Sequence, residues 1–293
     1  MTQVLNALYD HTFSDSSFGY RPGRSQAQAA ERARRYVQRG ANYVVSIDLS
    51  KFFDRVNHDR LMSRLATRIK DKRVLKLIRA FLNSGIQLEN NEITYPGEGT
   101  PQGGPLSPLL SNIVLDELDW EMARRGLSFV RYADDFILGF IGSKSEAKQI
   151  KESIRAFLQD RLKLEMSASK TLITHARTEK AHFLSYDISI YQNNDALSRT
   201  TGDDRKNMRS INGHIRLGVP YGLTTELARR YQRNGKVISE AALLAFSDAH
   251  IIDVYQKRFR GLAEYYKYAV DRCHLGKIKT VMEINPNAVM IVK

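Results

Sequence analysis

The sequence predicts an α+β fold, in which helices pack on one face of an antiparallel sheet. Two segments have the apolar pattern of buried strands, Tyr43–Leu49 and Phe129–Phe140, and the second is long enough to form a hairpin. Apolar residues at helical spacing follow in three segments, 60–83, Leu109–Arg124 and Ser143–Leu164. A strand, a helix, a hairpin and a helix in this order suit an antiparallel sheet with helices on one side.

Two adjacent carboxylates stand at the centre of the predicted hairpin. Asp134 and Asp135 lie between two apolar runs, so we expect them at the turn. Neighbouring acids repel each other and lose hydration at the end of a sheet, and a divalent cation offsets this cost. Aspartate is also common in ordinary turns, where it bonds backbone N–H groups. The dipeptide alone therefore favours a simple turn over a metal site.

A third carboxylate, Asp48, stands at the end of the first predicted strand. Beside the hairpin pair it would complete a cluster able to hold two magnesium ions about 3.5–4 Å apart, with manganese as an alternative ion. Such a cluster serves in-line phosphoryl transfer, because one ion activates the attacking hydroxyl while the other neutralises the leaving pyrophosphate. Strands often end in aspartate, so Asp48 does not by itself establish the cluster.

A loop rich in glycine and proline, Gly97–Asn112, lies between the two acidic strands in the sequence. Its glycines would let the backbone approach a base or a sugar closely. Ser107 and Pro108 are predicted as the N-cap and the first residue of the following helix. An ordinary strand-to-helix turn is the alternative interpretation of the same residues.

Three segments, taken in order, carry a family resemblance: Ile47–Asp54, Gly99–Leu109 and Arg131–Asp135. They resemble the successive sequence blocks of reverse transcriptases, in the form found in proteins encoded by group II introns. The resemblance extends from about Ser16 to about Ala269, which is most of the chain. It implies the right-hand fold of polymerases, with a palm built on the sheet, a truncated fingers region and a helical thumb or maturase region.

Site residues follow from this resemblance. Asp48, Asp134 and Asp135 would be catalytic, and together with Leu49 they would hold two magnesium ions. The residues that would contact the incoming deoxynucleotide are Arg21, Phe53, Gln102, Gly103 and Lys170. The residues that would contact nucleic acid are Arg24, Tyr132, Leu184, Ser185, Arg258, Arg260 and Tyr265.

The resemblance also implies how some of these side chains act. An aromatic residue at the position of Phe53 stacks under the sugar and excludes a 2′-hydroxyl, which would lose its water there without gaining a partner. Gln102 would touch the nucleotide and the template base, and Gly103 would let the backbone approach them. Lys170 would offset the charge of the triphosphate.

The segment Ser16–Ser25 resembles a further block of the family, the second one. Its glycines and proline predict a rigid turn that presents Arg21 and Arg24 to phosphate groups. Ser25 is predicted as the N-cap of a helix over Gln26–Gln38. A solvated basic turn is the alternative interpretation.

Another match, Ala181–Ile188, resembles the hairpin that grips the primer end in the family. The family usually has glycine where Ser185 stands. If the backbone at this position requires a positive φ, serine would weaken or shift the grip.

The composition limits the class of partner. Lys and Arg number 45 against 32 Asp and Glu, so the formal charge is +13 and a polyanionic partner is favoured. Charge alone does not separate RNA from DNA or from an anionic membrane. No apolar run reaches the roughly 18–20 residues that span a bilayer. The single cysteine, Cys273, excludes an intramolecular disulfide and favours a reducing, intracellular setting. The expected compartment is the cytoplasm of a bacterium, with an organelle as the alternative.

The predicted organisation is a fingers remnant over residues 1–40, a palm over 41–190, and a linker with a helical thumb or maturase region over 191–293. The last region includes a helix, Ile251–Ala269, whose interleaved basic and tyrosine side chains suit RNA binding or packing. The chain begins almost directly at the second block, so we expect a fragment, a truncated copy or a protein completed by another chain. No endonuclease domain is predicted.

The resemblance implies an RNA-directed DNA polymerase that uses an RNA template, a DNA primer and deoxynucleoside triphosphates, and that also binds group II intron RNA. A non-catalytic splicing factor that keeps the palm as a scaffold is the alternative. A reverse transcriptase of another bacterial defence or diversification system would share the same chemistry. The sequence predicts no membrane partner and leaves the oligomeric state open.

Overall fold

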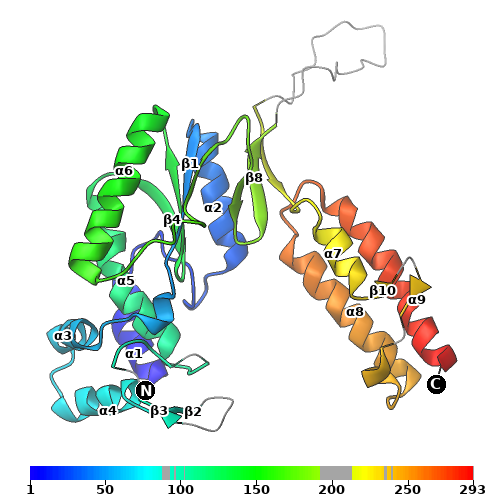
Figure 1. The fold of residues 1–293 in the computed structure, drawn as a ribbon, viewed down its shortest axis with the longest axis horizontal. Coiled ribbons are helices and arrows are strands. Elements are labelled where there is room, and N and C mark those ends of the chain that lie inside the picture. Colours follow the sequence, from blue (N-terminus) through cyan, green and yellow to red (C-terminus); the bar gives the residue numbers. More distant parts are fainter. Residues whose placement is uncertain are drawn as a thin grey trace, which may run out of the picture. The chain divides into compact units, whose positions relative to one another are not determined.

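The computed structural model describes residues 1–87, 93–95, 97–101, 103–191, 213–233, 236–238 and 240–292. The chain divides into two compact units, Met1–Leu184 and Ser185–Lys293 (Figure 1). The helices and strands of the first unit are α1 (Thr2–Tyr9), α2 (Gln26–Gln38), β1 (Tyr43–Asp48), α3 (His58–Arg68), α4 (Lys72–Leu82), β2 (Ile86–Gln87), β3 (Ile93–Thr94), α5 (Ser107–Arg124), β4 (Ser128–Tyr132), β5 (Asp135–Phe140), α6 (Lys144–Phe157), β6 (Leu172–His175) and β7 (Ala181–Phe183). Those of the second unit are β8 (Tyr186–Ile190), β9 (Ile215–Gly218), α7 (Leu223–Arg229), β10 (Gln232–Arg233), β11 (Lys236–Val237), α8 (Asp248–Tyr265) and α9 (Gly276–Val292).

The first unit is built on a four-stranded sheet with the order β4-β5-β1-β6, and its described pairs are antiparallel. Val45 pairs with Leu138 and Ile47 with Phe136, and these apolar side chains belong to the core that also includes residues of α5 and α6. The predicted α+β architecture, with helices packed on an antiparallel sheet, is therefore confirmed.

Helix α2 lies on the other face of the sheet from α5 and α6 (Figure 1). Gly139 of β5 permits this packing, because a Cβ there would lie 2.8 Å from Cβ of Tyr36 and 3.2 Å from Cβ of Ala41. Ser25 caps α2, and its side chain and that of Gln28 form a reciprocal capping box. The predicted helix Gln26–Gln38 and its N-cap are confirmed.

The prediction of a single helix over residues 60–83 is wrong. Two helices occur here, α3 and α4, because α3 ends at Arg68 and the carboxylate of Asp71 accepts a hydrogen bond from the backbone N–H of Arg73. Aspartate stabilises a helix start more than a helix interior, so Asp71 begins a new helix. The periodicity of apolar residues continues across the break and conceals it.

The start of α5 also differs from the prediction. Ser107 is the first helical residue and not the N-cap, which is Leu106. The hydroxyl of Ser107 donates to the carbonyl of Pro101 at 2.5 Å, so it ties the helix to the preceding loop. Pro108 lies in the first turn of the helix, where its missing N–H costs no hydrogen bond.

The second unit contains an antiparallel pair, β8 and β9, and a helical part. The helical part packs around a cluster that includes Ile251 and Tyr255 of α8 and Ile278 and Met282 of α9. Helix α8 ends at Tyr265, earlier than the predicted end at Ala269. The predicted linker after Tyr191 falls on residues 192–212, which lie outside the described residues.

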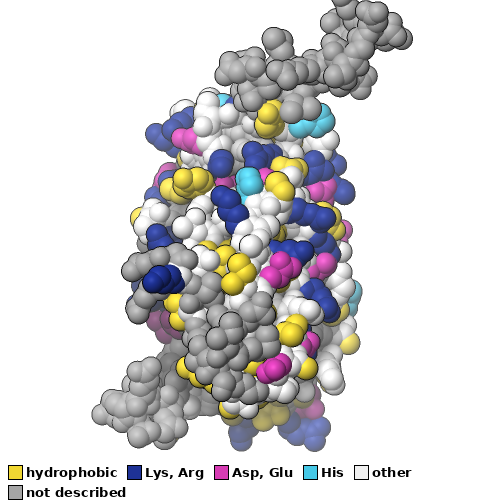
Figure 2. All heavy atoms as spheres, turned by 90° about the vertical axis from the view of Figure 1, so that its right-hand side faces the viewer, with side chains coloured by type: hydrophobic (Ala, Val, Ile, Leu, Met, Phe, Trp, Pro, Cys, Tyr) yellow, Lys and Arg dark blue, Asp and Glu magenta, His cyan; other side chains and the backbone are white. Residues whose placement is uncertain are grey.

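Lys and Arg side chains are spread over the face drawn in Figure 2, with Asp and Glu side chains among them. A search of the described helices finds none with the length and apolar character needed to cross a bilayer. Positive charge is thus spread over this face and does not by itself mark a binding site.

Candidate active site

Three carboxylates from two segments that are far apart in the sequence meet at one end of the central sheet. Asp48 is the last residue of β1 and lies directly opposite Asp135, the first residue of β5. Tyr132 pairs with Asp135, so Ala133 and Asp134 form a two-residue turn between β4 and β5. Ala133 adopts a left-handed conformation with φ of 57°. The structure therefore brings together the three acids that the sequence singled out.

The carboxylates affect one another electrostatically. Burial and, after it, the neighbouring charges of Asp134 and Asp48 together raise the pKa of Asp135 to about 6. Burial also raises the pKa of Asp134, and Asp48 contributes in the same direction. Lys170 opposes both shifts, and its Nζ lies 3.5 Å from Oδ2 of Asp48. Negative charge is thus concentrated here and only partly balanced by a lysine.

Among the described residues, no three acidic, histidine or cysteine side chains lie close enough together to form a ready metal cluster. The donor chemistry at the end of β1 nevertheless fits magnesium, because its carboxylate oxygens are the hard ligands that this ion prefers. Asp48, Asp134 and Asp135 would hold the ions. The side chain of Leu49 is buried in the core, so only its backbone carbonyl can serve as a ligand.

A buried arginine supports the turn that carries Asp134. The side chains of Arg131 and Asp119 are both fully buried, and Arg131 Nη2 donates to Asp119 Oδ2 at 2.6 Å. Nη1 of the same arginine donates to the carbonyl of Ala133 at 3.0 Å and to the side chain of Asn112 at 2.7 Å. Arg131 therefore links the turn that carries Asp134 to α5.

The N-terminal segment packs against the same turn. The backbone N–H of Arg131 donates to the carbonyl of Ser16, and the N–H of Phe18 donates to the carbonyl of Arg131, both at 2.8 Å. A Cβ on Gly19 would lie 2.3 Å from the backbone nitrogen of Ala133, so only glycine fits at this position. Asn112 donates to the carbonyl of Gly19 at 2.8 Å. The segment is thus tied both to the turn and to α5.

Sequence reasoning did not identify Arg131, Asp119 and Asn112 as site residues. A signal was present, because Arg131 interrupts an apolar strand directly before the turn. A charged residue in a buried strand requires a buried partner of opposite charge.

Phe53 lies in a short 3₁₀ turn, Phe52–Asp54, after Lys51 in a left-handed conformation. Phe52 is buried in the core, and the half-buried ring of Phe53 meets it edge-on at 5.3 Å between centroids. The carbonyl of Phe53 accepts a hydrogen bond from the N–H of Thr100 at 2.6 Å. The loop rich in glycine and proline is thereby attached to the Phe53 segment.

Gly99 is needed for this attachment. A Cβ there would lie 2.9 Å from the carbonyl oxygens of Phe53 and Asp54. Gly103 is exposed, has φ of 83° and would have open space around a Cβ. The predicted nucleotide contact Gln102 lies outside the described residues.

The expectation that the second block presents Arg21 to a ligand is wrong. Arg21 is 8% exposed, and its guanidinium donates to Asp10 Oδ1 at 2.8 Å and to the backbone carbonyls of Asp10, Ser14 and Ser17. Arg21 therefore holds the N-terminal segment together, because its donors are used within the chain. Arg24 is more exposed and binds Asp15 at 2.7 Å.

The other residues predicted to contact nucleic acid have varied surroundings. Tyr132 faces Tyr20 with 6.3 Å between ring centroids, and Arg260 lines a groove formed by α8 and α9. In the second unit, Arg258 forms an ion pair with Glu240 at 2.7 Å, and Tyr265 stacks on another tyrosine. Binding of nucleic acid by these side chains stays a prediction.

Leu184 and Ser185 follow β7 directly, and both have a positive φ, 49° and 57°. The backbone at Ser185 therefore does require a positive φ, the left-handed conformation that glycine adopts most easily. Leu184 carries the same strain with a larger side chain. Its carbonyl accepts a hydrogen bond from Gln26 at 3.0 Å.

An antiparallel sheet backed by helices, with acids gathered where β1 ends and the β4–β5 hairpin turns, defines the palm of a polymerase. Residues 1–188 match the family described as "Reverse transcriptase (RNA-dependent DNA polymerase)", and the chain belongs to this family. Polymerases of this family generally use divalent metal ions.

Curated relatives confirm the resemblance to proteins of group II introns. The group II intron-encoded protein LtrA of Lactococcus lactis subsp. cremoris is 29% identical over 354 residues, which covers 96% of this chain and 57% of LtrA. Protein YkfC of Escherichia coli (strain K12) is 30% identical over 212 residues, with 60% of this chain and 55% of YkfC covered. Nuclear intron maturase 3 of Arabidopsis thaliana is 25% identical over 208 residues, covering 62% of this chain and 29% of the maturase. The chain spans about half the length of LtrA and YkfC.

Solved structures agree on the fold. Telomerase from Candida albicans, determined with a TWJ fragment of telomeric RNA, matches with a TM-score of 0.50 and 14% identity, covering 98% of this chain and 50% of the telomerase. At this identity the match shows a common fold only.

Proposed function

We propose that this chain is an RNA-directed DNA polymerase of the group II intron type, which adds deoxynucleotides to the 3′-hydroxyl of a primer. The pairing of Asp48 with Asp135, beside Asp134 in the turn, carries the proposal. Three carboxylates at one end of a sheet are the arrangement that two-ion phosphoryl transfer requires. Family membership supports the same chemistry.

In the proposed reaction, the 3′-oxygen of the primer attacks the α-phosphate in line, and pyrophosphate leaves. Bound at Asp48, Asp134 and Asp135, two divalent ions would lower the pKa of the attacking hydroxyl and neutralise the leaving group. Lys170 contributes positive charge on the triphosphate side, since it already lies beside Asp48. Phe53 screens the sugar, and its segment is held in place by the hydrogen bond from Thr100.

Primer extension on an RNA template, with magnesium and deoxynucleotides, tests the proposal. We expect extension by the wild-type chain and a loss on the order of 10³-fold in Asp134→Ala, because a group that binds the ions is removed. Asp59→Ala removes an acidic side chain that is 84% exposed, and it should leave the rate unchanged. Equal rates in wild type and Asp134→Ala would reject the proposal.

A second function, assistance of intron splicing by RNA binding, is favoured by the intron maturase among the relatives and by the formal charge of +13. Splicing of a group II intron RNA at limiting magnesium, with and without the protein, tests this function. If Asp134→Ala supports splicing as well as wild type, the two functions are separable. If neither protein accelerates splicing, the maturase role is excluded for this chain.

A further inference from the structure

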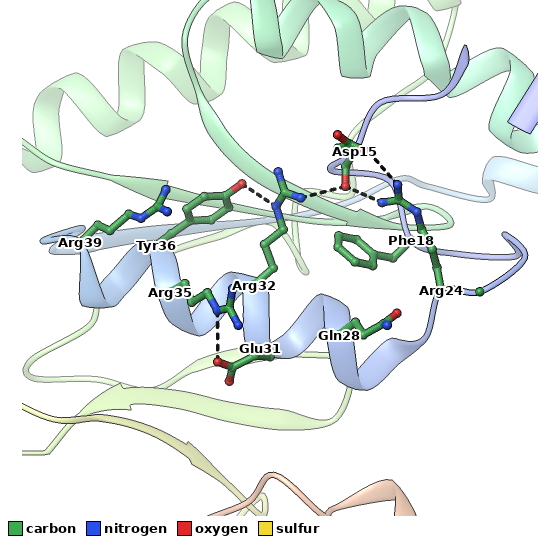
Figure 3. Close-up of a pocket in the computed structure, with 10 residues that line it drawn as sticks. Asp15, Phe18, Arg24, Gln28, Glu31, Arg32, Arg35, Tyr36 and Arg39 are labelled. Atoms are coloured by element: carbon green, nitrogen blue, oxygen red, sulfur yellow. Dashed lines mark hydrogen bonds and ion pairs between the residues drawn. The ribbon is translucent and has the colours of Figure 1, made fainter. Parts of the chain in front are cut away.

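A basic groove lies beside α2, on the first unit and separate from the three carboxylates. It has a volume of about 560 Å³. Helix α2 and the loop before it supply its walls (Figure 3). The residues on which the argument rests are Asp15, Phe18, Arg24, Arg32, Arg35 and Arg39.

The lining of this arginine groove has an excess of positive charge. Its ionised side chains are four arginines against Asp15 and Glu31, which leaves two positive charges unbalanced. Arg35 forms an ion pair with Glu31 at 3.3 Å and is 64% exposed. The side chain of Arg39 makes no hydrogen bond or ion pair with any described residue. Charge is therefore available to an anion that enters the groove.

The arginines at one end of the groove are held in a fixed arrangement. Arg24 donates to Asp15 Oδ1 at 2.7 Å, and Arg32 donates to the carbonyl of Asp15 at 3.0 Å and to the hydroxyl of Tyr36 at 3.1 Å. Both guanidinium groups lie over the ring of Phe18, at 5.2 and 5.8 Å from its centroid (Figure 3). Because these side chains are already ordered, little entropy is lost when their remaining N–H groups bind a ligand.

The spacing of the arginines favours a chain of anions over one small anion. Arg32 and Arg35 of α2 and Arg39, its C-cap residue, recur at helical spacing, so the row they form is about 10 Å long. Repeated negative charges of this kind occur along a sugar–phosphate backbone. Phe18 is buried beneath two guanidinium groups, and the Tyr36 hydroxyl donates to the carbonyl of Phe129, so neither ring is placed to stack on a base. Contacts in the groove would thus be made to phosphate groups and not to bases.

We propose that the arginine groove is a second nucleic-acid site, which binds the phosphate backbone of an RNA strand outside the catalytic centre. The choice of RNA as the strand rests on the proposed function. Binding there is independent of sequence and depends strongly on salt, since each phosphate contact releases counterions.

The salt dependence of RNA binding tests this proposal in the full chain, without deoxynucleotides. We compare wild type with Arg35→Ala/Arg39→Ala, using a fluorescent single-stranded RNA and anisotropy at several salt concentrations. Loss of two phosphate contacts should reduce the slope of log K against log salt by about 1.4 and weaken binding on the order of tenfold at low salt. Arg35→Lys/Arg39→Lys should restore most of the slope, because it restores the charge.

A charge-matched control is available on α6, on the other face of the sheet (Figure 1). Lys148→Ala/Arg155→Ala removes two charges from partly or fully exposed positions and should leave the slope unchanged. A wild-type slope in Arg35→Ala/Arg39→Ala, or an equal decrease in the α6 variant, would overturn the proposal. Displacement of the RNA by inorganic phosphate at concentrations too low to screen charge would show a small-anion site and would also overturn it.

Measurement of primer extension beside RNA binding distinguishes a failure of the groove proposal from a failure of the proposed polymerase function. At saturating primer and template, Arg35→Ala/Arg39→Ala should extend primers at the wild-type rate, whereas Asp134→Ala should bind RNA with the wild-type slope and not extend. If the wild-type chain binds RNA with the predicted salt dependence and extends no primer, the polymerase function fails and the groove remains supported. If the wild-type chain extends primers and Arg35→Ala/Arg39→Ala keeps the wild-type salt slope of RNA binding, only the groove proposal is rejected.

Discussion

Asp48 and Asp135 lie directly opposite each other in the antiparallel ladder of β1 and β5. Opposed residues in such a ladder have Cβ atoms roughly 4.5–5.5 Å apart, and like charges there destabilise the fold. Burial is the largest cause of the raised pKa of Asp135, about 6, and the charges of Asp134 and Asp48 add to it. The site therefore lowers stability in return for a concentrated negative charge that suits cations.

Removal of the charge at Asp135 should stabilise the protein. Because the pKa of this residue is higher in the folded state than its usual 3.8, the folded protein retains a proton that the unfolded chain loses. The free energy of unfolding should thus fall as pH rises from about 4 to about 6, and Asp135→Asn should flatten this dependence. At pH 7 we expect Asp135→Asn to be more stable by about 1–3 kcal/mol.

Urea unfolding at pH 4 to 8 provides the measurement, with and without magnesium. Magnesium should stabilise the wild type and have less effect on Asp135→Asn, since one ligand is lost. A variant that is less stable than wild type at pH 7 would show that the Asp135 charge is well compensated in the fold.

Arg131 should be essential for the stability of the palm. Arg131→Met leaves the fully buried carboxylate of Asp119 without its partner, and breaking such a pair costs about 3–5 kcal/mol. Arg131→Met/Asp119→Leu removes both charges and should recover part of the loss. Urea denaturation of the single and double variants measures both effects.

The control for this prediction is Arg124→Met, which removes an arginine that is 73% exposed and ion-paired to Glu121. Its unfolding midpoint should equal that of the wild type. A double variant as unstable as Arg131→Met would indicate that the hydrogen bonds to Ala133 and Asn112, and not the charge pair, dominate.

Ser185→Gly should stabilise the chain and improve its hold on a primer. Ser185 has φ of 57°, and a non-glycine residue in this conformation costs about 1–2 kcal/mol. We expect a higher melting temperature and longer products in primer extension. Ser189→Gly, within strand β8, is the matched control and should destabilise, because glycine weakens a strand interior. Shorter products with Ser185→Gly would show that the strained turn is needed for extension.

Phe53→Ala should relax the choice of sugar. Loss of the ring removes the surface against which a 2′-hydroxyl would be left without a hydrogen-bond partner. We expect the ratio of kcat/KM for deoxynucleotides over ribonucleotides to fall by about 10–100-fold, mainly because ribonucleotides are used better. Phe246→Ala, at an exposed phenylalanine, should keep the wild-type ratio. An unchanged ratio in Phe53→Ala would exclude Phe53 from sugar selection.

Agreement between sequence and structure is best where the signal is local. The helix Gln26–Gln38 has the predicted bounds because Ser25 and Gln28 form its capping box within a few residues. The strand at Tyr43 and the turn at Asp134 follow equally local patterns. The predicted helix over residues 60–83 is divided because Asp71 caps a new helix. The apolar period continues across this break and did not reveal it.

Arg21 shows where local reasoning failed. Glycine and proline correctly indicate a turn around it, but they do not indicate the direction of the side chain. Asp10 and the carbonyls of the N-terminal segment surround its guanidinium and bury it. Such partners are visible only once the chain is folded.

The sequence by itself determined the two strand segments that carry the acids, most helices of the first unit, the family and the identity of the three acids, because periodicity, capping and motif order are properties of neighbouring residues. Only the tertiary structure decided that Asp48 lies opposite Asp135, that Arg131 is buried against Asp119, and that arginines of α2 line a groove. The physical reason is that strand register and burial of charge depend on contacts between segments distant in the chain, and these are selected by packing of the whole unit.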